Sequence, residues 1–357
     1  MREIVYGYDS PPIEDCFARS APEQIGFELL QACNLRCEYC YLGDPQNRVK
    51  GAIELEQGKQ VLAHLHEAGV ISMQFFGGEP TLHPHLLEFV DYAKQVGIPD
   101  VGVQTNGFCK DEALVTELSN RTDWVHVTFR GSDGDTFDRH AGTSGSYEKA
   151  VRTLEILNRG TTFIGLEYDC CSDNWHQVEG LLDHLIGERK IDIREIWLHR
   201  IAPRGCAADM TLHSDVELFT GVLEQCVRIE EKFGILAKME DSLPPCLFED
   251  SLHPYILPCK GGFVSAYVDP TGNVRRCACS KHNIGNLFNE SLESMWRESP
   301  VMKSFRKMKW LPEPCKNCAI LNRCRGGCSV SSPCSDDHSP DVFSSLFKPR
   351  TVDGRGA

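Results

Sequence analysis

The stretch that decides the fold is CNLRCEYC at residues 33–40, in which Cys33, Cys37 and Cys40 stand at a C-x3-C-x2-C spacing. Three thiolates in one short loop can hold three irons of a [4Fe-4S] cluster and leave the fourth iron open to a small ligand. A zinc site completed by a histidine is the alternative, but the loop contains no histidine. The loop therefore predicts a reactive iron–sulfur cluster.

A second group of cysteines lies near the C-terminus. It begins with Cys259, Gly272 and Cys277 at a C-x12-G-x4-C spacing and continues as a C-x2-C-x5-C-x3-C run with one further cysteine behind it. The run and the cysteine that follows it are Cys315, Cys318, Cys324, Cys328 and Cys334. Seven cysteines supply most of the ligands of two further clusters. A zinc ribbon is the alternative, because zinc also takes four cysteines arranged as C-x2-C pairs.

Composition limits the function classes that need to be considered. The 357 residues are 41% hydrophobic and 25% charged, which suffices for one large or two modest globular domains. The net charge of −14 argues against nonspecific nucleic-acid binding, which needs Lys and Arg against phosphates. No stretch has the roughly 18 apolar residues of a membrane span, and the N-terminus lacks a signal peptide's apolar core. We expect a cytoplasmic protein, in which 18 cysteines favour metal ligation over disulfides.

Short apolar strands alternate with amphipathic helices through the first two thirds of the chain. The predicted strands are 25–30, 71–76, 101–105, 124–129, 163–168 and 195–198. The predicted helices are 55–68, 86–95, 112–119, 147–157, 178–186 and 216–233. Six β/α units predict an α/β fold built as a partial (β/α)6 TIM-like barrel, with its chemistry at the carboxyl ends of the strands.

A break follows the last predicted helix, and from Pro244 the composition becomes rich in Pro, Cys and Gly, with a hairpin signal at residues 269–273. This part has too little apolar surface to fold alone, so we expect its iron–sulfur clusters to stabilise the folded form. The predicted organisation has four parts. They are an N-terminal extension at 1–24, the barrel at 25–235, a small cysteine-rich domain at 236–340 and a loosely ordered polar tail at 341–357.

These motifs together resemble those of the radical SAM enzymes, and within them the subgroup with a C-terminal SPASM domain that binds two auxiliary iron–sulfur clusters. Tyr39 stands before the last cysteine of the loop, where this family places a residue against the adenine. Gly77, Gly78, Glu79 and Pro80 are similar to the family's GGEP segment, whose backbone and carboxylate hold the methionyl amine. The resemblance covers nearly the whole chain and implies three cofactors: S-adenosylmethionine, the [4Fe-4S] cluster of the loop, and the two auxiliary clusters.

Polar residues stand at the ends of the later strands. Gln104, Thr105 and Asn106 end the third strand, where the resemblance implies a ribose and the alternative is capping of the next helix. Relatives show Ser-x-Asp-Gly after the fourth strand, whereas this chain reads Thr128-Phe129-Arg130-Gly131, which weakens the transfer of roles there. The predicted cofactor-binding residues are Tyr39, Gly77, Gly78, Glu79, Gln104, Thr105, Asn106 and Thr128. Position alone ranks Arg130, Glu167 and Arg200 as catalytic candidates, with surface salt bridges as the alternative.

The resemblance also divides the C-terminal cysteines between two clusters. It implies that Cys315, Cys318, Cys324 and Cys334 bind the distal cluster and that Cys259, Cys277 and Cys328 bind the proximal one. Some relatives supply a fourth proximal cysteine six positions after the first, where this chain has Ser265. Cys279, Cys246 or an exchangeable ligand must then complete the proximal cluster.

The resemblance implies an oxidoreductase-type enzyme that reductively cleaves S-adenosylmethionine to a 5′-deoxyadenosyl radical and abstracts a substrate hydrogen. One hypothesis is oxidation or crosslinking of a peptide or protein side chain, as in peptide maturases and anaerobic sulfatase-maturating enzymes. The other is a dehydrogenase or epimerase of a small molecule such as an aminocyclitol or sugar. An iron–sulfur electron carrier would leave the GGEP segment unexplained.

The same reasoning predicts the partners of the protein. We expect a peptide or small-molecule substrate, a reductant such as flavodoxin or ferredoxin, and no nucleic acid or membrane. Only about 24 residues precede the first predicted strand, too few for the leader-binding domain that many peptide maturases carry. Leader recognition is therefore expected to need a separate protein or an exposed strand edge.

Overall fold

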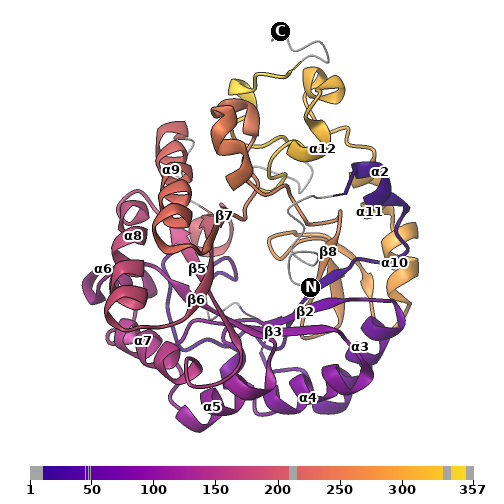
Figure 1. Ribbon diagram of the computed structural model, residues 1–357. Helices are drawn as coiled ribbons and strands as arrows, with labels where there is room; N and C mark the ends of the chain where they lie inside the picture. The colour runs from indigo at the N-terminus through magenta and orange to yellow at the C-terminus, as the bar shows by residue number, and fades with distance from the viewer. Residues whose placement is uncertain are drawn as a thin grey trace.

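The computed structural model describes residues 11–44, 46, 48, 50–208, 215–332 and 339–350. Six parallel strands follow one another in chain order, and helices cover them from outside (Figure 1). The strands are β1 (Gln24–Glu28), β2 (Ser72–Phe76), β3 (Asp100–Thr105), β4 (Trp124–Phe129), β5 (Phe163–Cys170) and β6 (Ile193–Arg200). The helices that match predicted ones are α3 (Leu55–Glu67), α4 (Leu86–Val96), α5 (Glu112–Arg121), α7 (Ser146–Leu157), α8 (Val178–Leu182) and α9 (Val216–Phe233). The predicted α/β partial barrel is confirmed.

Local chemistry explains why most of these boundaries could be predicted. The α9 helix begins where the Asp215 carboxylate accepts hydrogen bonds from the amides of Glu217 and Leu218, and it ends at Gly234, whose φ is +66°. Both are standard helix-end signals, an acidic N-cap and a left-handed glycine. The structure therefore reproduces the predicted helix over 216–233 residue for residue.

Two helical segments differ from the prediction. The helix expected over 178–186 ends as an α-helix at Leu182 and continues as a wider π-helical stretch over Asp183–Glu188. An additional helix, α6 (Gly134–Ala141), was not predicted because its sequence GDTFDRHA is mostly polar. Its beginning carries a signal that could have been read, since the Asp133 side chain caps the amide of Thr136 at 2.8 Å.

The sheet continues past the predicted barrel at both edges. A seventh parallel strand, β7 (Leu236–Met239), pairs with β6, and β8 (Ser265–Val268) from the cysteine-rich region pairs in parallel with β1. The hairpin strands β9 (Asn273–Arg275) and β10 (Asn283–Asn286) extend that edge, which gives a ten-stranded sheet within the described residues. The cysteine-rich region is thus a continuation of the sheet, and it lies directly beside the strand that leads to Cys33.

Short helices complete the cysteine-rich region, with α12 at the top of Figure 1 and α10 and α11 at its right-hand side. They are α10 (Leu292–Glu298), α11 (Pro300–Arg306), α12 (Leu321–Cys324) and 3₁₀ turns at Pro245–Leu247, Asp250–Tyr255 and Glu313–Asn317. The N-terminal helix α2 (Ile13–Ala18) packs here too, because Ile13 and Cys16 share an apolar cluster with Phe263 and Phe305.

The expectation of a loosely ordered polar tail is wrong for residues 341–350. Phe343 is fully buried and packs with the core residues around Phe219 of α9. Asp341 is 1% exposed and accepts hydrogen bonds from Arg200 and from the amide of Cys328. Specific tertiary partners, which composition cannot reveal, order this segment. Residues 351–357 lie outside the described residues.

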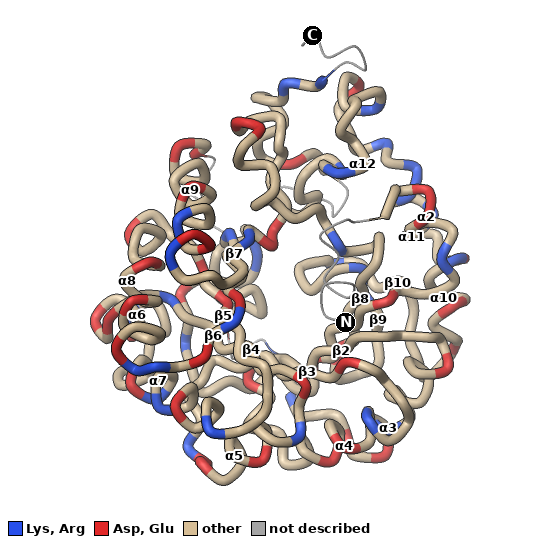
Figure 2. The backbone as a smooth tube through the Cα atoms, viewed as in Figure 1, with Lys and Arg blue, Asp and Glu red and all other residues tan. Residues whose placement is uncertain are grey.

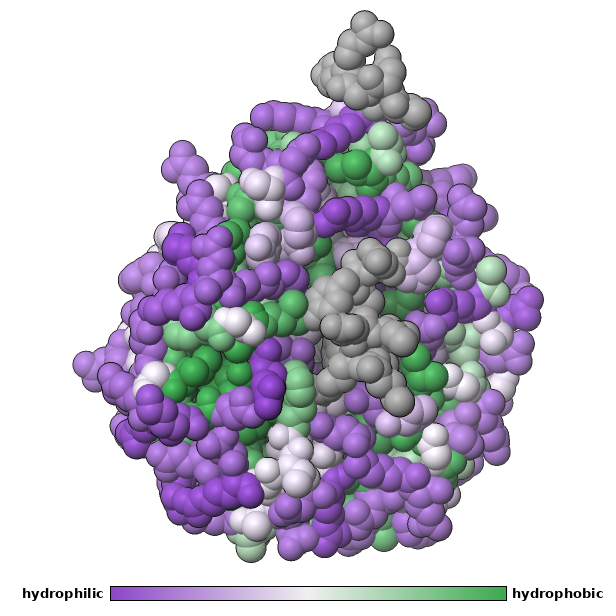
Figure 3. Space-filling view, in the orientation of Figure 1, coloured by the Kyte–Doolittle hydropathy of each residue, from purple (hydrophilic) through white to green (hydrophobic). Residues whose placement is uncertain are grey.

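The outer surface is that of a globular protein. Acidic and basic residues alternate over the outer helices (Figure 2), and the face seen in Figure 3 is mostly hydrophilic with apolar side chains in the gaps. In the described part of the chain, no helix combines the length and the apolar character that crossing a membrane requires.

Candidate active site and cluster-binding cysteines

A cavity of about 390 Å³ extends from the barrel interior, beside Gln24 and Ser72, to the carboxyl ends of the strands. Both cysteine-bearing parts of the chain line it. The cysteines on its wall are Cys33, Cys37, Cys40, Cys259, Cys277, Cys279 and Cys328. The size suits a small cofactor and part of a substrate. The parallel pairing of β1 with β8 is what brings the two parts to one cavity.

The first cysteine loop follows β1, and several hydrogen-bond donors point at its sulfurs. The Cys33 Sγ accepts from the Leu35 amide at 3.4 Å and from Asn106 Nδ2 at 3.5 Å, and the Cys40 Sγ accepts from Arg48 Nη2 at 3.1 Å. Burial raises the pKa of the Cys33 thiol to about 11. The donors favour the thiolate form, so metal binding that displaces the protons fits this loop.

The spacing of the sulfurs bears on the zinc alternative. Ligands around one tetrahedral zinc ion lie roughly 3.8 Å apart, given zinc–sulfur bonds of about 2.3 Å. Among the described residues, the sets of three potential ligand atoms within 4.8 Å of one another are His140–Cys171–Asp173 and Glu167–His199–Glu240. Neither set contains a cysteine of the two motifs. Among the described residues, no three sulfurs of the two motifs therefore lie as close together as the ligands of one zinc ion.

The GGEP segment packs against the backbone that leads into the cysteine loop. Gly77 has φ +152°, and a Cβ on Gly78 would lie 2.1 Å from the Ala32 carbonyl oxygen. The amides of Gly78 and Glu79 donate to the carbonyls of Leu30 and Ala32 at 2.8 and 2.9 Å. The two glycines therefore permit a close approach between two segments of this chain, and because both also line the cavity, the predicted approach to a ligand stays a prediction.

The Glu79 carboxylate is fully buried and ties the end of β2 to the end of β3. Its Oε1 accepts from the Thr81 amide and hydroxyl and from the Thr105 hydroxyl, and its Oε2 accepts from the Asn106 amide at 2.8 Å. Burial raises the pKa of Glu79, and these hydrogen bonds oppose the increase. Glu79 also lines the cavity, so its predicted role toward an ammonium group stays a prediction.

The other predicted cofactor residues lie on the same wall. Gln104, Thr105, Asn106 and Thr128 all line the cavity, and Gln104 hydrogen-bonds Gln74 of β2. Asn106 reaches the cysteine loop through its contacts with Cys33 and Asn34. The polar residues at the end of β3 therefore hold the cysteine loop in place, in addition to binding any ligand.

Tyr39 and Arg130 form the wall beside the first loop. Tyr39 is buried, and its Oη has no hydrogen-bond partner among the described residues. The guanidinium of Arg130 is buried 3.5 Å from the Asp169 carboxylate, and the charges of Cys37 and Asp169 help to keep its pKa high. An orphaned hydroxyl and a buried cation at one wall suit a polar ligand that carries a negative group.

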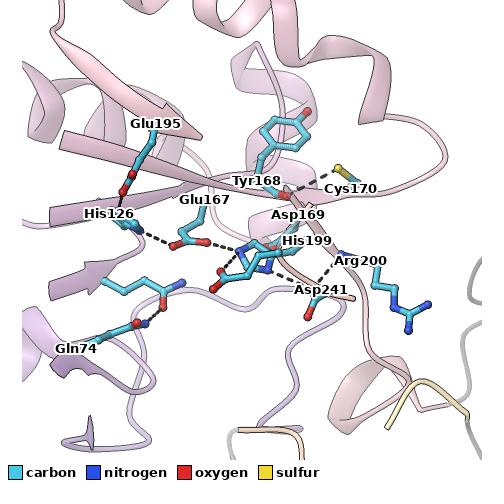
Figure 4. A network of polar contacts seen from close by, with 12 residues as sticks. Gln74, His126, Glu167, Tyr168, Asp169, Cys170, Glu195, His199, Arg200 and Asp241 are labelled. Atoms are coloured by element: carbon cyan, nitrogen blue, oxygen red, sulfur yellow. Dashed lines mark hydrogen bonds and ion pairs between the residues drawn. The ribbon is translucent and has the colours of Figure 1, made fainter. Parts of the chain in front are cut away.

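Glu167, a predicted catalytic residue, is not on the cavity wall. It lies inside the barrel between two histidines, as Figure 4 shows: its Oε1 contacts His126 Nδ1 at 2.6 Å, and its Oε2 contacts His199 Nε2. His126 also contacts Glu195 at 2.8 Å through Nε2, and His199 contacts Asp241 at 3.1 Å through Nδ1. A polar chain thus runs through the barrel, and only its His199 and Asp241 end faces the cavity.

Charge pairing among these polar residues shifts the pKa values of the histidine and the carboxylate in opposite directions. Burial alone would lower the pKa of His126, but its hydrogen bonds to Glu167 and Glu195 raise it to about 9. Burial would raise the pKa of Glu167, but the charge of His199 and the hydrogen bond from His126 lower it. The histidines are therefore positively charged and the carboxylates between them negatively charged. This alternation links β4, β5 and β6 to one another inside the barrel.

Arg200, the third catalytic candidate, lines the cavity but is also part of a link between the two parts of the chain. Its Nη2 lies 2.5 Å from Asp341 Oδ2, and the same oxygen accepts from the Cys328 amide at 2.7 Å. Arg200 therefore orients the Cys328 loop through Asp341. Sequence reasoning missed Asp341, and nothing around that residue in the sequence marks it.

The C-terminal cysteines fall into two places. Cys259, Cys277, Cys279 and Cys328 all line the cavity, and a hydrogen bond from Cys279 lowers the pKa of Cys277 to about 6. Cys315, Cys318 and Cys324 lie away from the cavity, around α12 and the 3₁₀ turn before it. Cys334 lies outside the described residues.

Comparison with known proteins agrees with this arrangement. The profile of the radical SAM superfamily matches residues 27–166, and that of the SPASM iron–sulfur cluster-binding domain matches residues 259–319. The PqqA peptide cyclase of Rhizobium meliloti (strain 1021) is 26% identical over 84% of this chain and 80% of its own length. Mycofactocin maturase MftC of Mycobacterium tuberculosis (strain ATCC 25618 / H37Rv) is 27% identical over 87% of this chain and 79% of its own.

A solved structure shares the fold at lower sequence identity. Streptococcus suis SuiB bound to precursor peptide SuiA superposes with a TM-score of 0.76 at 16% identity, over 94% of this chain and 78% of that chain. The likeness covers the barrel and the cysteine-rich region together.

Proposed function

This chain belongs to the radical SAM superfamily and carries a SPASM domain, and we propose that it oxidises or crosslinks a side chain of a peptide. The observation that carries the proposal is the shared cavity, on which three cysteines of the barrel loop and four of the C-terminal region lie together. One of the relatives named above is a PqqA peptide cyclase and the other a mycofactocin maturase, and the first of these supports a peptide substrate.

The residues on the cavity wall fit the cofactors of the family. Cys33, Cys37 and Cys40 would hold the first cluster, and Arg48 and Asn106 would donate hydrogen bonds to its sulfur ligands. Bound S-adenosylmethionine and this cluster together supply a carbon-centred radical that removes a hydrogen atom from the substrate. The task of the protein is to bind, orient and keep out water.

We assign Arg130 to the cofactor rather than to the chemistry of the substrate. Its guanidinium is buried beside Tyr39 and within electrostatic reach of Cys37, which is the loop side of the cavity. A buried cation with one acidic neighbour, Asp169, can take a second carboxylate such as that of a methionyl group. The orphaned Tyr39 Oη and the carboxylate of Glu79 would contact other polar parts of the same molecule.

The oxidoreductase character of the proposal rests on the four cavity cysteines of the SPASM region. Cys259, Cys277, Cys279 and Cys328 would hold the proximal cluster, with Cys279 as the fourth ligand that the sequence left open. A cluster at the cavity wall can accept the electron that a substrate radical loses when it is oxidised, while the accompanying proton passes to a cavity group. His199 and Asp241 are charged groups on that wall.

The small-molecule alternative is not favoured, because the PqqA cyclase named above acts on a peptide. A reductant such as flavodoxin or ferredoxin is proposed as electron donor to the first cluster. A separate leader-binding protein is proposed as a further partner for a peptide substrate.

The test is release of 5′-deoxyadenosine from anaerobically reconstituted protein with a strong reductant and candidate peptides. A peptide substrate should increase the release of 5′-deoxyadenosine above the basal rate. Deuterium placed at the position of the peptide that is modified should appear in the released 5′-deoxyadenosine. The matched control is the variant with Cys33, Cys37 and Cys40 replaced by Ala, which should release none. Stimulation by sugars or aminocyclitols, and by no peptide, would overturn the proposal.

A further inference from the structure

Cys246 lies in the 3₁₀ turn Pro245–Leu247, between β7 and the first cysteine of the SPASM motif. It is half-buried, and the motif does not include it. The sequence leaves Cys246, Cys279 and an exchangeable ligand as the candidates for completing the proximal cluster. In the structure Cys246 is absent from the cavity wall that carries Cys259, Cys277, Cys279 and Cys328. Its surroundings belong instead to the second, distal set of cysteines.

A short backbone segment contacts both Cys246 and Cys318. The amide of Lys348 donates to Cys246 Sγ at 3.4 Å, and the amide of Arg350 donates to Cys318 Sγ at 3.3 Å. Pro349, between them, has no N–H and favours an extended conformation in the residue before it, so the two amides lie at most about 7 Å apart. Backbone amides that donate to sulfur are typical partners of cluster thiolates, because they stabilise the negative charge.

Three further contacts fix the Cys246 turn against the distal cysteines. The Ala319 amide donates to the Arg350 carbonyl at 2.9 Å, and Arg350 Nη1 contacts Asp250 Oδ2 at 3.1 Å. On the other side, Arg323 Nη2 donates to the His253 carbonyl at 2.5 Å. The segment that follows Cys246 is thus tied both to the Cys318 loop and to α12, which ends at Cys324.

The contacts of the two candidate cysteines therefore differ. Cys246 shares the Lys348–Arg350 segment with Cys318, whereas Cys279 lies on the cavity wall with Cys277 and Cys328.

We propose that Cys246 is the fourth protein ligand of the distal cluster, together with Cys315, Cys318 and Cys324. A cluster of this kind takes four cysteine ligands, so each auxiliary cluster then has a complete set within the described residues and Cys334 is not required. The proposal rests on the proposed function only in taking the SPASM region to hold iron–sulfur clusters. It does not depend on the substrate.

The test compares iron and sulfide content, with Mössbauer and EPR spectra, in the full-length reconstituted protein and four single variants. Cys246→Ala and the positive control Cys318→Ala each leave three cysteine ligands, so each should change the spectrum of one auxiliary cluster and lose up to about one third of the iron, one cluster of three. Cys334→Ala and the negative control Cys226→Ala, a buried cysteine of α9, should keep all of it. Iron loss in Cys334→Ala, or full iron and an unchanged spectrum in Cys246→Ala, would overturn the proposal.

A second variant covers the case in which Cys246→Ala does not fold. Cys246→Ser keeps an oxygen ligand, so we expect the full iron content with a changed EPR signal from one reduced auxiliary cluster and a far-ultraviolet circular dichroism spectrum like that of the parent. A parent-like EPR signal in Cys246→Ser would contradict the assignment. These outcomes are distinct from failure of the proposed function, in which the parent protein itself would hold zinc, one cluster only, or fail to cleave S-adenosylmethionine.

Discussion

The two cysteine-bearing regions differ in how far apart along the chain their members lie. The barrel loop holds Cys33, Cys37 and Cys40 within eight residues directly after one strand, and its spacing alone predicts its chemistry. The cavity-lining set of the SPASM region spans residues 259–328, and its members come together because β8 pairs with β1 and Asp341 binds both Arg200 and the Cys328 loop. A local site can be read from spacing, whereas a site assembled by tertiary contacts cannot.

The strongest test of this comparison removes the local site. Replacing Cys33, Cys37 and Cys40 together with Ala should abolish all cleavage of S-adenosylmethionine while about two thirds of the iron remains, because the other two clusters form independently. Iron analysis and 5′-deoxyadenosine release measure the two effects. Loss of nearly all iron would mean that the SPASM sites need the barrel loop in order to assemble.

The converse change should separate cleavage from product formation. We expect Cys324→Ala to retain some uncoupled cleavage of S-adenosylmethionine but to lose modified product, since the electron that the proximal cluster accepts would have no onward path. The variant should also be less soluble, because the region depends on its clusters for folding. The measurement is the ratio of 5′-deoxyadenosine to modified product. A soluble variant that lacks its distal cluster and turns over at the wild-type rate would leave that cluster a purely structural role.

The Arg200–Asp341 pair tests the link between the regions. Asp341→Asn leaves the buried Arg200 guanidinium without its charge partner, which costs about 3–5 kcal/mol in comparable buried pairs. The apparent Tm, measured anaerobically at a fixed scan rate, should fall by several degrees. The matched control is Asp91→Asn, whose exposed pair with Arg121 should contribute no more than about 1 kcal/mol. Equal stability of the two variants would show that the link contributes little.

The smallest effect concerns the polar chain inside the barrel. The pKa of His126 is raised from 6.5 to about 9 by Glu167 and Glu195, so its contribution to stability is fully present below about pH 6.5 and is lost as the pH rises through 9. The apparent Tm should therefore decrease between pH 8 and 10. His126→Gln should be less stable at neutral pH, and its Tm should change less over that interval. An equal decrease in both proteins would assign the loss to other groups.

Most of the fold could be predicted from the sequence because its boundaries carry local signals. Asp215 and Gly234 mark the ends of α9, and the predicted strands lie within two residues of the observed ones. The exceptions lack such signals. The β7 strand is only four residues long, and the order of residues 341–350 depends on Asp341 and Phe343 finding partners far away in the chain.

The candidate site, like the fold, could be predicted only in part from the sequence. Position at a strand end identified Arg130 and Arg200 as cavity residues, but it also selected Glu167, which two histidines hold inside the barrel. Depth along the strand explains the error, because Glu167 shares the face of Asp169, which lines the cavity, but lies two residues further into the barrel, where His126 and His199 contact it. The partners that decide the outcome, His126 and His199, are on other strands.

The sequence by itself determined the first cysteine loop, the GGEP segment and the alternation of strands and helices, because each depends on residues close together in the chain. Only the tertiary structure decided where the remaining cysteines belong. Cys246 and Cys279 are equivalent candidates by sequence, yet backbone donors at Lys348 and Arg350 hold Cys246 beside Cys318, while Cys279 lies on the cavity wall with Cys277. Cluster ligands are selected by distance in space, and residues a hundred positions apart set that distance.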